Sequence, residues 1–441
     1  MSKEKLFESY LSTAVLLVQQ YDGSIPLSDF LKQYFSLNKK FGSRDRKHVS
    51  HLCYCYYRLG QNPPRSLKGE LLNLHNENLI SERLITALFL CSQHPNGLLA
   101  QLNPELNEKA ALVLNEKISL LNHPFNIADI FPLQDELSES IDATAFAVSH
   151  LIQPDLFLRI RPSQKNQVTR KLQENKIAFE ECDDDCLKLL NTTKVENILE
   201  LNKEVVVQDY SSQRISGFLQ PAKSTIVNLE SAIKVWDCCA ASGGKSILAV
   251  DVLPNIELTA SDIRSSIIHN LKNRFKEAEI KGYNSFVADL TNPKSEIRNP
   301  KFDLIICDVP CSGSGTWSRT PEQLYFFRKE KINYYSELQK KIVTNTIPHL
   351  TENSFFLYIT CSVFKKENEE VVEFIQNNFQ LQLIKQETLI GYDKKADTMF
   401  AALFVHSTQN KKQEFFLCSL SKVDIFLESK NPGFIERGTP K

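Results

Sequence analysis

The segment Asp237-Cys238-Cys239-Ala240-Ala241-Ser242-Gly243-Gly244-Lys245 decides the fold, because it places a glycine turn directly after an apolar, strand-like run. Two further segments, Asp308-Val309-Pro310-Cys311-Ser312-Gly313 and Tyr358-Ile359-Thr360-Cys361-Ser362, also follow strand-like runs. The carboxyl ends of parallel strands share one edge of a sheet, and ligands of such sheets bind there. The three segments therefore predict a single site in an α/β domain, with a glycine turn, two thiols and a carboxylate.

Around these segments the chain alternates between strand-like and helix-like patterns. We expect strands over residues 233–238, 257–260, 285–288, 302–307, 355–359, 379–384, 401–406 and 415–419. Helices are expected between them, starting at residue 244, over residues 263–278, in a long stretch before Pro348 and over residues 365–375. This order predicts a parallel sheet with helices on both faces, which is a Rossmann-like α/β domain over residues 226–425.

The rest of the chain shows other periodicities, so we expect a multidomain protein. Residues 1–130 carry apolar residues at helical spacing and predict an N-terminal all-α domain. Residues 131–154 are interpreted as a linker helix, and residues 155–225 as a small α+β subdomain. Residues 426–441 form a predicted C-terminal tail.

The composition is that of a globular protein. Of 441 residues, 42% are hydrophobic and 24% are charged, and no apolar stretch reaches membrane-spanning length. The N-terminus lacks the apolar core of a signal peptide, so we expect a soluble, cytoplasmic protein, and a monomer. The cysteines are expected to be reduced, with Cys53, Cys55, Cys91, Cys307 and Cys418 in the core. Cys182 and Cys186 have no second cysteine pair near them, so no metal site is expected.

The distribution of charge is more informative than the net charge of −1. Between residues 39 and 68 there is one acid, Asp45, with Tyr54, Tyr56 and Tyr57 interleaved. The eight basic residues of this stretch are Lys39, Lys40, Arg44, Arg46, Lys47, Arg58, Arg65 and Lys68. Such a stretch predicts a surface that binds phosphates, although a solvated helix face would give the same pattern.

Four acids at successive strand ends favour an adenosine cofactor. A single strand-end aspartate is more often a cap or turn former, but here a Gly-Gly turn accompanies four of them. Asp262 would bind ribose hydroxyls and Asp289 an adenine edge. The turn lacks the glycine spacing of dinucleotide and P-loop sites, so S-adenosylmethionine fits best. The predicted cofactor-binding residues are Cys239, Ala240, Ala241, Ser242, Gly243, Gly244, Lys245, Asp262, Asp289 and Asp308.

The two cysteine segments and the glycine turn resemble the signature segments of RNA cytosine-C5 methyltransferases, most closely the Sun or RsmB branch. Residues 207–213 and 397–402 resemble two further segments of that family. Residues 41–47 and 57–60 are similar to the NusB-like RNA-binding domain fused to this branch. The resemblance implies a class I methyltransferase fold and S-adenosylmethionine-dependent transfer of a methyl group to cytosine in RNA, 16S ribosomal RNA above all.

The resemblance also implies roles for individual residues. Cys361 would add to C6 of cytosine, Cys311 would assist the later elimination, and Asp308 would hydrogen-bond the ring near N3. We expect a helix starting near Lys365 to activate Cys361, with the help of Lys365 or Lys366. The target cytosine must be single-stranded or flipped out. Further candidate RNA contacts are Arg159, Arg161 and Arg319, while Trp317 would stack on a base or close the domain.

The sequence departs from the family pattern in three places. Ser242 stands where proline is usual, Thr398-Met399 replaces a glycine-containing pair, and residues 145–150 occupy the region of a missing tryptophan segment. One alternative is a methyltransferase acting on a nitrogen of RNA or protein, but Asp308–Cys311 lacks the second proline and the aromatic residue this needs. Another is a non-catalytic, RNA-binding ribosome-assembly factor with a vestigial methyltransferase fold, which the intact cysteines disfavour.

Overall fold

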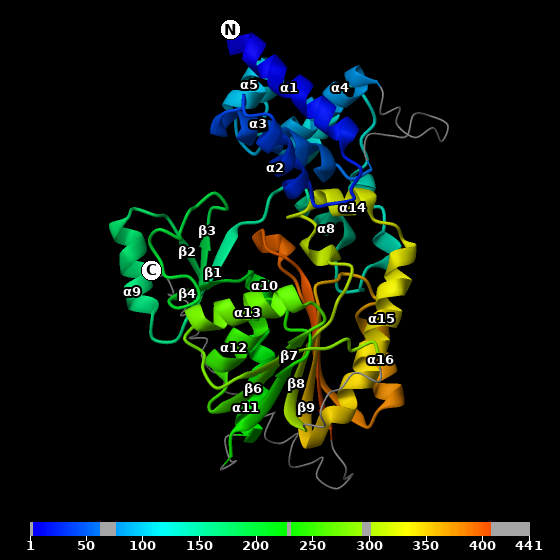
Figure 1. The fold of residues 1–441 in the computed structure, drawn as a ribbon. Coiled ribbons are helices and arrows are strands. Elements are labelled where there is room, and N and C mark those ends of the chain that lie inside the picture. The colour runs from blue at the N-terminus through cyan, green and yellow to red at the C-terminus, as the bar shows by residue number, and fades with distance from the viewer. Residues whose placement is uncertain (1–2, 62–75, 227–230, 293–300, 407–441) are drawn as a thin grey trace, which may run out of the picture.

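The structure is a computed structural model that describes residues 3–61, 76–226, 231–292 and 301–406. Figure 1 shows a helical region at the top, a small sheet at the left and a larger sheet below. The described part of the helical region contains α1 (Lys3–Gln20), α2 (Leu27–Leu37), α3 (Ser43–Arg58), α4 (Glu77–Cys91), α5 (Gly97–Leu102), α6 (Pro104–Glu108), α7 (Leu114–Ser119), η1 (Ile127–Ile130), η2 (Gln134–Glu136) and α8 (Ala143–Ser149).

The helical region has one hydrophobic core, and this core extends beyond the region itself. Tyr56 and Tyr57 on α3 are buried in it, because they lie on the apolar face of that helix. Trp317 and Phe364, which follow the two cysteine segments, are fully buried in the same core. The helices therefore pack directly on the loops that carry Cys311 and Cys361.

The small sheet lies beside the larger one and is antiparallel. Its strands are ordered β2-β3-β1-β4, with β1 paired to β3 and β4. The elements of this part are β1 (Leu156–Ile160), α9 (Lys165–Glu174), β2 (Glu180–Asp183), β3 (Cys186–Leu189), β4 (Val205–Val207), α10 (Tyr210–Gln213) and α11 (Ser216–Ile226).

Within the described residues, the larger sheet has seven strands in the order β10-β11-β9-β8-β5-β6-β7. It is formed by β5 (Ile233–Asp237), α12 (Gly244–Val252), β6 (Ile256–Asp262), α13 (Ser265–Glu277), β7 (Asn284–Val287), β8 (Phe302–Asp308), η3 (Ser314–Thr316), α14 (Pro321–Phe326), α15 (Glu330–Thr346), η4 (Ile347–His349), β9 (Leu350–Thr360), α16 (Glu369–Asn378), β10 (Leu381–Leu389), η5 (Tyr392–Lys394) and β11 (Met399–His406).

The expectation of a fully parallel sheet is wrong at one edge. Strands β5 to β9 are parallel to one another, but β11 runs antiparallel to both β9 and β10. Only a short η5 turn region connects β10 to β11, and so short a connection can join antiparallel strands but not parallel ones. The expected strand over residues 415–419 lies outside the described residues.

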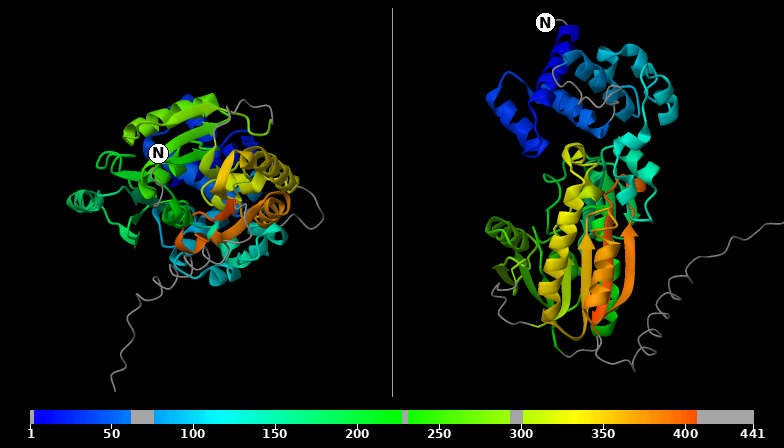
Figure 2. Two further views of the ribbon diagram at one scale, coloured as in Figure 1. Left: turned by 90° about the horizontal axis from the view of Figure 1, so that it is seen from below. Right: turned by 90° about the vertical axis from the view of Figure 1, so that its right-hand side faces the viewer.

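Helices cover both faces of the larger sheet, as the alternating pattern predicted. Successive side chains of a strand point to opposite faces. Val235 and Leu304 accordingly belong to the core beneath α11, α12 and α13, whereas Trp236 and Ile305 belong to the core beneath α15 and α16. Figure 2 shows these layers, with the helical region stacked on one end of the sheet.

The strand order creates a point where a ligand can bind. β5 is flanked by β6 on one side and β8 on the other, so the chain leaves β5 in one direction and later returns on its opposite side. In open α/β sheets ligands bind outside the carboxyl ends of the strands at such a switch point. The glycine turn after β5 and the loop after β8 both lie there.

Candidate active site

The loops that follow β8 and β9 bring the two predicted cysteines together. The strands are parallel neighbours, with Asp308 opposite Ile359, so their ends lie side by side. The Sγ atoms of Cys311 and Cys361 are 3.2 Å apart, and both residues are partly exposed. A ligand at this edge of the sheet can therefore reach both sulfurs.

A glycine permits this close approach of the loops. The Gly315 amide donates to the Cys361 carbonyl oxygen at 2.9 Å, and the Gly315 carbonyl oxygen accepts from the Thr398 amide at 2.9 Å. A Cβ atom at position 315 would lie 1.9 Å from the Thr398 carbonyl oxygen. Thr398-Met399 replaces a glycine-containing pair of the family without disturbing this contact. Thr398 contacts Gly315 through its backbone, so its side chain does not interfere.

The two thiols differ in their surroundings. The hydrogen bond to Cys361, followed by burial, raises the pKa of the Cys311 thiol well above its ordinary value. Either thiol can be the donor in this contact, and the raised pKa favours the protonated form of Cys311.

The expected helix start near Lys365 is wrong, because α16 begins at Glu369 and residues 365–368 form a turn before it. The Lys365 Nζ atom is 2.9 Å from Glu139 Oε1, so this lysine is paired away from Cys361.

Asp308 is part of a polar chain at the end of β8. Its carboxylate Oδ2 is 3.1 Å from Nζ of Lys245, which in turn donates to Ser212 Oγ at 2.9 Å. The Asp308 side chain is 27% exposed and the Lys245 side chain 11%. The ion pair joins the glycine turn to the strand that leads to Cys311.

The glycine turn has a conformation that only certain residues tolerate. Gly243 has φ +84°, and a Cβ atom there would lie 2.5 Å from the Phe275 ring. Ala241 also has a positive φ of 46°. Ser242 is held in place because Arg274 Nη1 donates to its Oγ at 2.9 Å, which explains how the turn forms without the proline usual in the family.

The acids predicted to bind adenosine lie at the strand ends as expected. Asp262 Oδ2 accepts from the Ala241 amide at 3.2 Å, and Arg264 Nε donates to its Oδ1 at 3.0 Å. Asp289 forms a turn with Thr291, whose hydroxyl donates to it at 2.6 Å. Cys239 is partly exposed, and Ala240 is buried with its amide 2.8 Å from the Ser261 carbonyl oxygen.

Two features near this turn were missed by the sequence reasoning. Ile263 directly follows Asp262 and is 56% exposed, which gives an apolar surface beside the carboxylate. Asp237 is fully buried, and this burial raises the pKa of its carboxyl group to about 7. The hydrogen bond that Ser246 Oγ donates to it at 2.6 Å acts in the opposite direction and lowers the pKa. An apolar residue after a strand-end acid was the available signal for Ile263.

Four residues suggested as RNA contacts have other roles in the structure. Arg159 is buried and Arg161 largely so, and both form ion pairs with Asp251. Trp317 is 0% exposed and packs against aromatic rings of the helical region's core, so it closes the domain. Periodicity could not reveal Asp251 as the partner, because it lies about 90 residues from the arginines.

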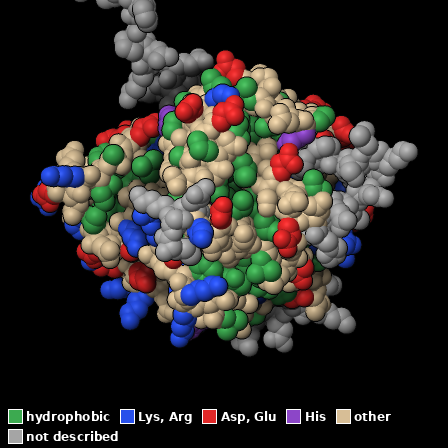
Figure 3. Space-filling model, turned by 90° about the horizontal axis from the view of Figure 1, so that it is seen from above, with side chains coloured by type: hydrophobic (Ala, Val, Ile, Leu, Met, Phe, Trp, Pro, Cys, Tyr) green, Lys and Arg blue, Asp and Glu red, His purple; other side chains and the backbone are tan. Residues whose placement is uncertain are grey.

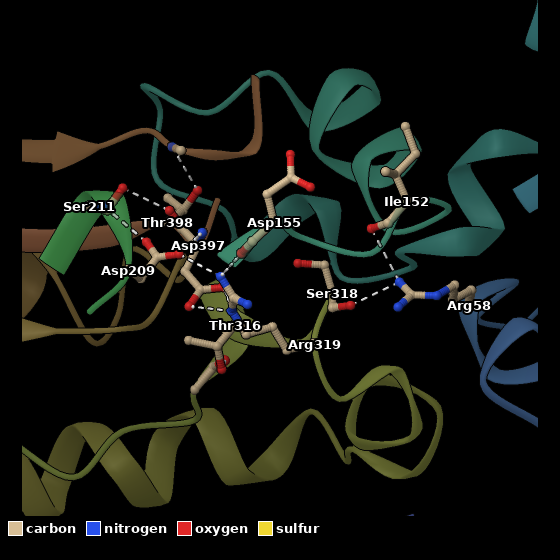
Figure 4. Close-up of polar contacts among 12 residues, drawn as sticks. Arg58, Ile152, Asp155, Asp209, Ser211, Thr316, Ser318, Arg319, Asp397 and Thr398 are labelled. Atoms are coloured by element: carbon tan, nitrogen blue, oxygen red, sulfur yellow. Dashed lines mark hydrogen bonds and ion pairs between the residues drawn. The ribbon is translucent and has the colours of Figure 1, made fainter. Parts of the chain in front are cut away.

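The fourth of these residues, Arg319, lies in a buried junction shown in Figure 4. It donates to Asp209 at 2.7 Å and to Asp397 at 2.8 Å. Close by, Arg58 donates to the backbone oxygens of Ser318 and His150, both at 2.8 Å. Arg58 therefore does not belong to a phosphate-binding surface, but fixes the helical region to the loop after Cys311.

The other described basic residues of the predicted stretch are at the surface. Figure 3, seen from above, shows Lys and Arg side chains gathered toward one edge of this face. The exposed members of the predicted stretch are Lys39, Lys40, Arg44, Arg46 and Lys47. Tyr56 and Tyr57 are buried, so they are not available for stacking. Arg65 and Lys68 lie outside the described residues.

Searches for two other kinds of feature gave no candidate in the described part of the chain. No cluster of three or more metal-ligating His, Cys, Asp or Glu side chains occurs among these residues. None of the helices described is both long and apolar enough to cross a membrane.

Comparison with known proteins identifies the segment that contains the site. Residues 224–421 match the model of a family described as 16S rRNA methyltransferase RsmB/F. This segment is similar to the proteins of that family. Its relatives include ribosomal RNA small subunit methyltransferase B of Photorhabdus laumondii, which is 31% identical over 189 residues, or 42% of this chain. The probable ribosomal RNA small subunit methyltransferase B of Bacillus subtilis is 28% identical over 235 residues, or 52% of this chain.

The RsmB/F match is confined to part of each protein. The aligned stretches span 41% and 51% of the length of those two relatives. In solved structures, PH0851 superposes on 90% of this chain and 98% of its own, with a TM-score of 0.64 and 18% identity. NSun6 from Pyrococcus horikoshii, solved with SFG, covers 63% of this chain and 97% of its own, with a TM-score of 0.53 and 12% identity. These likenesses establish the Rossmann-like methyltransferase fold.

Proposed function

We propose that this protein transfers a methyl group from S-adenosylmethionine to C5 of a cytosine in RNA, with 16S ribosomal RNA as the substrate. The observation that carries the proposal is the 3.2 Å separation of two sulfurs beside an aspartate at neighbouring strand ends. The RsmB/F match of residues 224–421 and the names of the relatives support the same reaction.

Two thiols meet a specific chemical need. Cytosine C5 is a poor nucleophile, but addition of the Cys361 thiolate to C6 makes C5 electron-rich enough to take an electrophilic methyl group. A base then takes the proton from C5, its bonding electrons re-form the C5–C6 double bond, and Cys361 leaves C6 as a thiolate. Cys311 lies 3.2 Å from that sulfur, so it can give its own proton to the departing thiolate and take the C5 proton in exchange.

Asp308 is placed to bind the ring that these thiols attack. It lies three residues before Cys311, and its carboxylate is partly exposed while Lys245 neutralises its charge at 3.1 Å. A carboxylate held in this way accepts hydrogen bonds from a cytosine edge near N3 and fixes the ring over the sulfurs. Ser212 in turn fixes Lys245 at 2.9 Å.

The glycine turn fits the adenosyl cofactor. Gly243 supplies the positive φ of +84° that the turn needs, and the start of α12 presents free amides to a carboxylate. Asp262 is placed for ribose hydroxyls, with the exposed Ile263 beside it for the face of a purine. When bound, the cofactor supplies the electrophilic methyl group. That NSun6, which shares this fold, was solved with SFG supports a ligand for this fold.

The exposed basic residues of the helical region are proposed to hold the RNA backbone. Phosphate contacts of this kind position a strand without reading its sequence. They leave base selection to the residues around the two cysteines, which can act only on a base that is unpaired or flipped out.

The proposal is tested with the full chain, labelled S-adenosylmethionine and unmodified 16S rRNA, followed by digestion to nucleosides. Label on 5-methylcytidine is the expected result. Label on a nitrogen-methylated nucleoside or on protein would replace it with the nitrogen-methyltransferase alternative. Binding of RNA without any transfer would favour the assembly factor with a vestigial fold.

A further inference from the structure

Glu367 lies behind the two cysteine loops and is hydrogen-bonded to both. Its side chain is 0% exposed. Its Oε2 accepts from the Ser312 amide at 2.9 Å, and its Oε1 accepts from the Ser362 hydroxyl at 2.8 Å. These two serines directly follow Cys311 and Cys361, so one carboxylate spans the positions next to both sulfurs.

A third element holds this carboxylate in place. Gln339 on α15 donates from Nε2 to Glu367 Oε2 at 2.9 Å and to the Pro310 carbonyl oxygen at 3.2 Å. The Tyr358 hydroxyl donates to the Glu367 carbonyl oxygen at 2.7 Å. Burying a carboxylate costs free energy of folding unless several hydrogen-bond donors satisfy it. Here three donors converge on its two oxygens.

The contacts of Glu367 differ from those of a carboxylate that only caps a helix. Glu369, two residues later at the first position of α16, accepts from the Ser138 hydroxyl at 2.9 Å. That bond leads away from the cysteines, toward the segment between η2 and α8. Glu367 instead joins the two loops whose relative position fixes the distance between the sulfurs.

The charge of Glu367 also acts on the thiols. After the hydrogen bond to Cys361 and burial, the nearby Glu367 carboxylate contributes to the raised pKa of Cys311. Burial raises the pKa of Glu367 itself, while its hydrogen bonds oppose that rise. The carboxylate therefore acts on both loops through its hydrogen bonds and on Cys311 also through its charge.

We propose that Glu367 is a positioning residue that holds the Cys311 and Cys361 loops in register, so that two thiols of unlike role act on one base. The assignment to catalysis rests on the proposed function, whereas the control of sulfur spacing does not. Glu367 touches neither substrate nor cofactor, and it acts through Ser312 and Ser362.

The spacing is measured with phenylarsine oxide, in which one arsenic atom bonds to two neighbouring thiols and its oxygen leaves as water with both thiol protons. Mass spectrometry of the peptides bridged through Cys311 and Cys361 gives the rate. In Glu367→Gln one of the two acceptor oxygens becomes an NH2 donor, so one loop loses the acceptor that holds it and the loops separate. We expect bridging to slow at least tenfold, and kcat for methyl transfer to fall at least tenfold with KM for RNA within twofold of wild type.

Glu369→Gln is the matched control, and its bridging rate and kcat should equal those of wild type. Should Glu367→Gln fail to fold, Ser362→Ala removes one of the bridging hydrogen bonds and leaves the carboxylate in place; it should slow bridging several-fold. Wild-type bridging rates in Glu367→Gln, or in Ser362→Ala if the first variant is unfolded, would overturn the proposal. If the wild-type protein transfers no methyl group but Glu367→Gln still slows bridging, the proposed function is wrong and the role of Glu367 in sulfur spacing stands.

Discussion

The loops that carry Cys311 and Cys361 end neighbouring parallel strands and place their sulfurs 3.2 Å apart, yet they differ in construction. The first loop continues through Gly315 into Trp317, which is fully buried in the helical region's core. The second is fastened to α16 through Glu367 and Asn368, whose side chains bond Ser362. Two similar residues thus have different surroundings, and those of Cys311 raise its pKa.

The strongest test of this difference removes one sulfur at a time, beginning with Cys361. Cys361→Ala should lower methyl transfer by at least about 10³-fold, because the covalent step has no other nucleophile. The affinity for S-adenosylmethionine, measured by calorimetry, should stay within twofold of wild type, since the glycine turn is untouched. Turnover near the wild-type rate would mean that the two loops have their roles reversed or share them.

Cys311→Ala should give the opposite signature. Addition to C6 and methyl transfer still occur, but release of Cys361 slows by about 10²-fold, in the range of a lost general acid–base group. A covalent protein–RNA species should then accumulate and migrate as a shifted band on a denaturing gel. The double variant Cys311→Ala/Cys361→Ala is the control and should show no such band. Absence of the band in the single variant would remove the release role from Cys311.

The same two loops show what the sequence could predict. Strand-like runs followed by small and polar residues indicate where each cysteine loop starts, because strand ends in a parallel sheet are marked by local composition. The meeting of Cys311 with Cys361 follows from the topology of that sheet. The role of Glu367 does not follow, because an acid in a charged run before an apolar helix has the pattern of a solvated first turn.

Arginines were the least predictable residues. Arg58 and Arg159 lie in patterns that suit a phosphate-binding surface, but both are buried against partners from distant segments. The local sequence shows that a side chain is charged. It does not show which carboxylate or carbonyl oxygen, from a distant segment, will bind that side chain in the fold. The strand β11 was expected over residues 401–406, but its antiparallel direction was not. An apolar run indicates that a strand forms and does not indicate which way the strand runs in the sheet.

Asp237 offers a pH-dependent test of the turn beside the first loop. Its pKa is about 7 when folded and 3.8 ordinarily, so the folded protein holds an extra proton between these values. Stability conferred by that proton is complete below about pH 4, falls as pH rises, and is fully lost above about pH 7. The loss is at most roughly 4 kcal/mol, from 1.4 kcal/mol for each pH unit.

Asp237→Asn lacks this titration, so its free energy of unfolding should come closest to that of wild type below about pH 4 and exceed it at pH 8. Urea unfolding of both proteins across that range measures the difference, in which other titrating groups cancel. Unfolding curves that stay parallel at all pH values would show that Asp237 ionises normally in the fold.

The smallest expected effect concerns the exposed basic residues of the helical region, which contrast with the buried Arg58. Lys39, Arg44 and Lys47 are exposed, and replacing all three by Gln should remove up to three phosphate contacts. RNA affinity should fall about tenfold, and the slope of log affinity against log salt should decrease by roughly 2, from 0.7 for each contact with a single strand. Filter binding at several salt concentrations measures both.

The matched control for this variant is Lys109→Gln, in the same helical region. Lys109 follows α6 and is paired with Glu105 at 2.9 Å, so its charge is already compensated and the salt slope should not change. An unchanged slope in the triple variant would move the RNA backbone to another face. The kcat of the triple variant at saturating RNA should equal that of wild type, because these side chains position the strand and do not touch the cysteine loops.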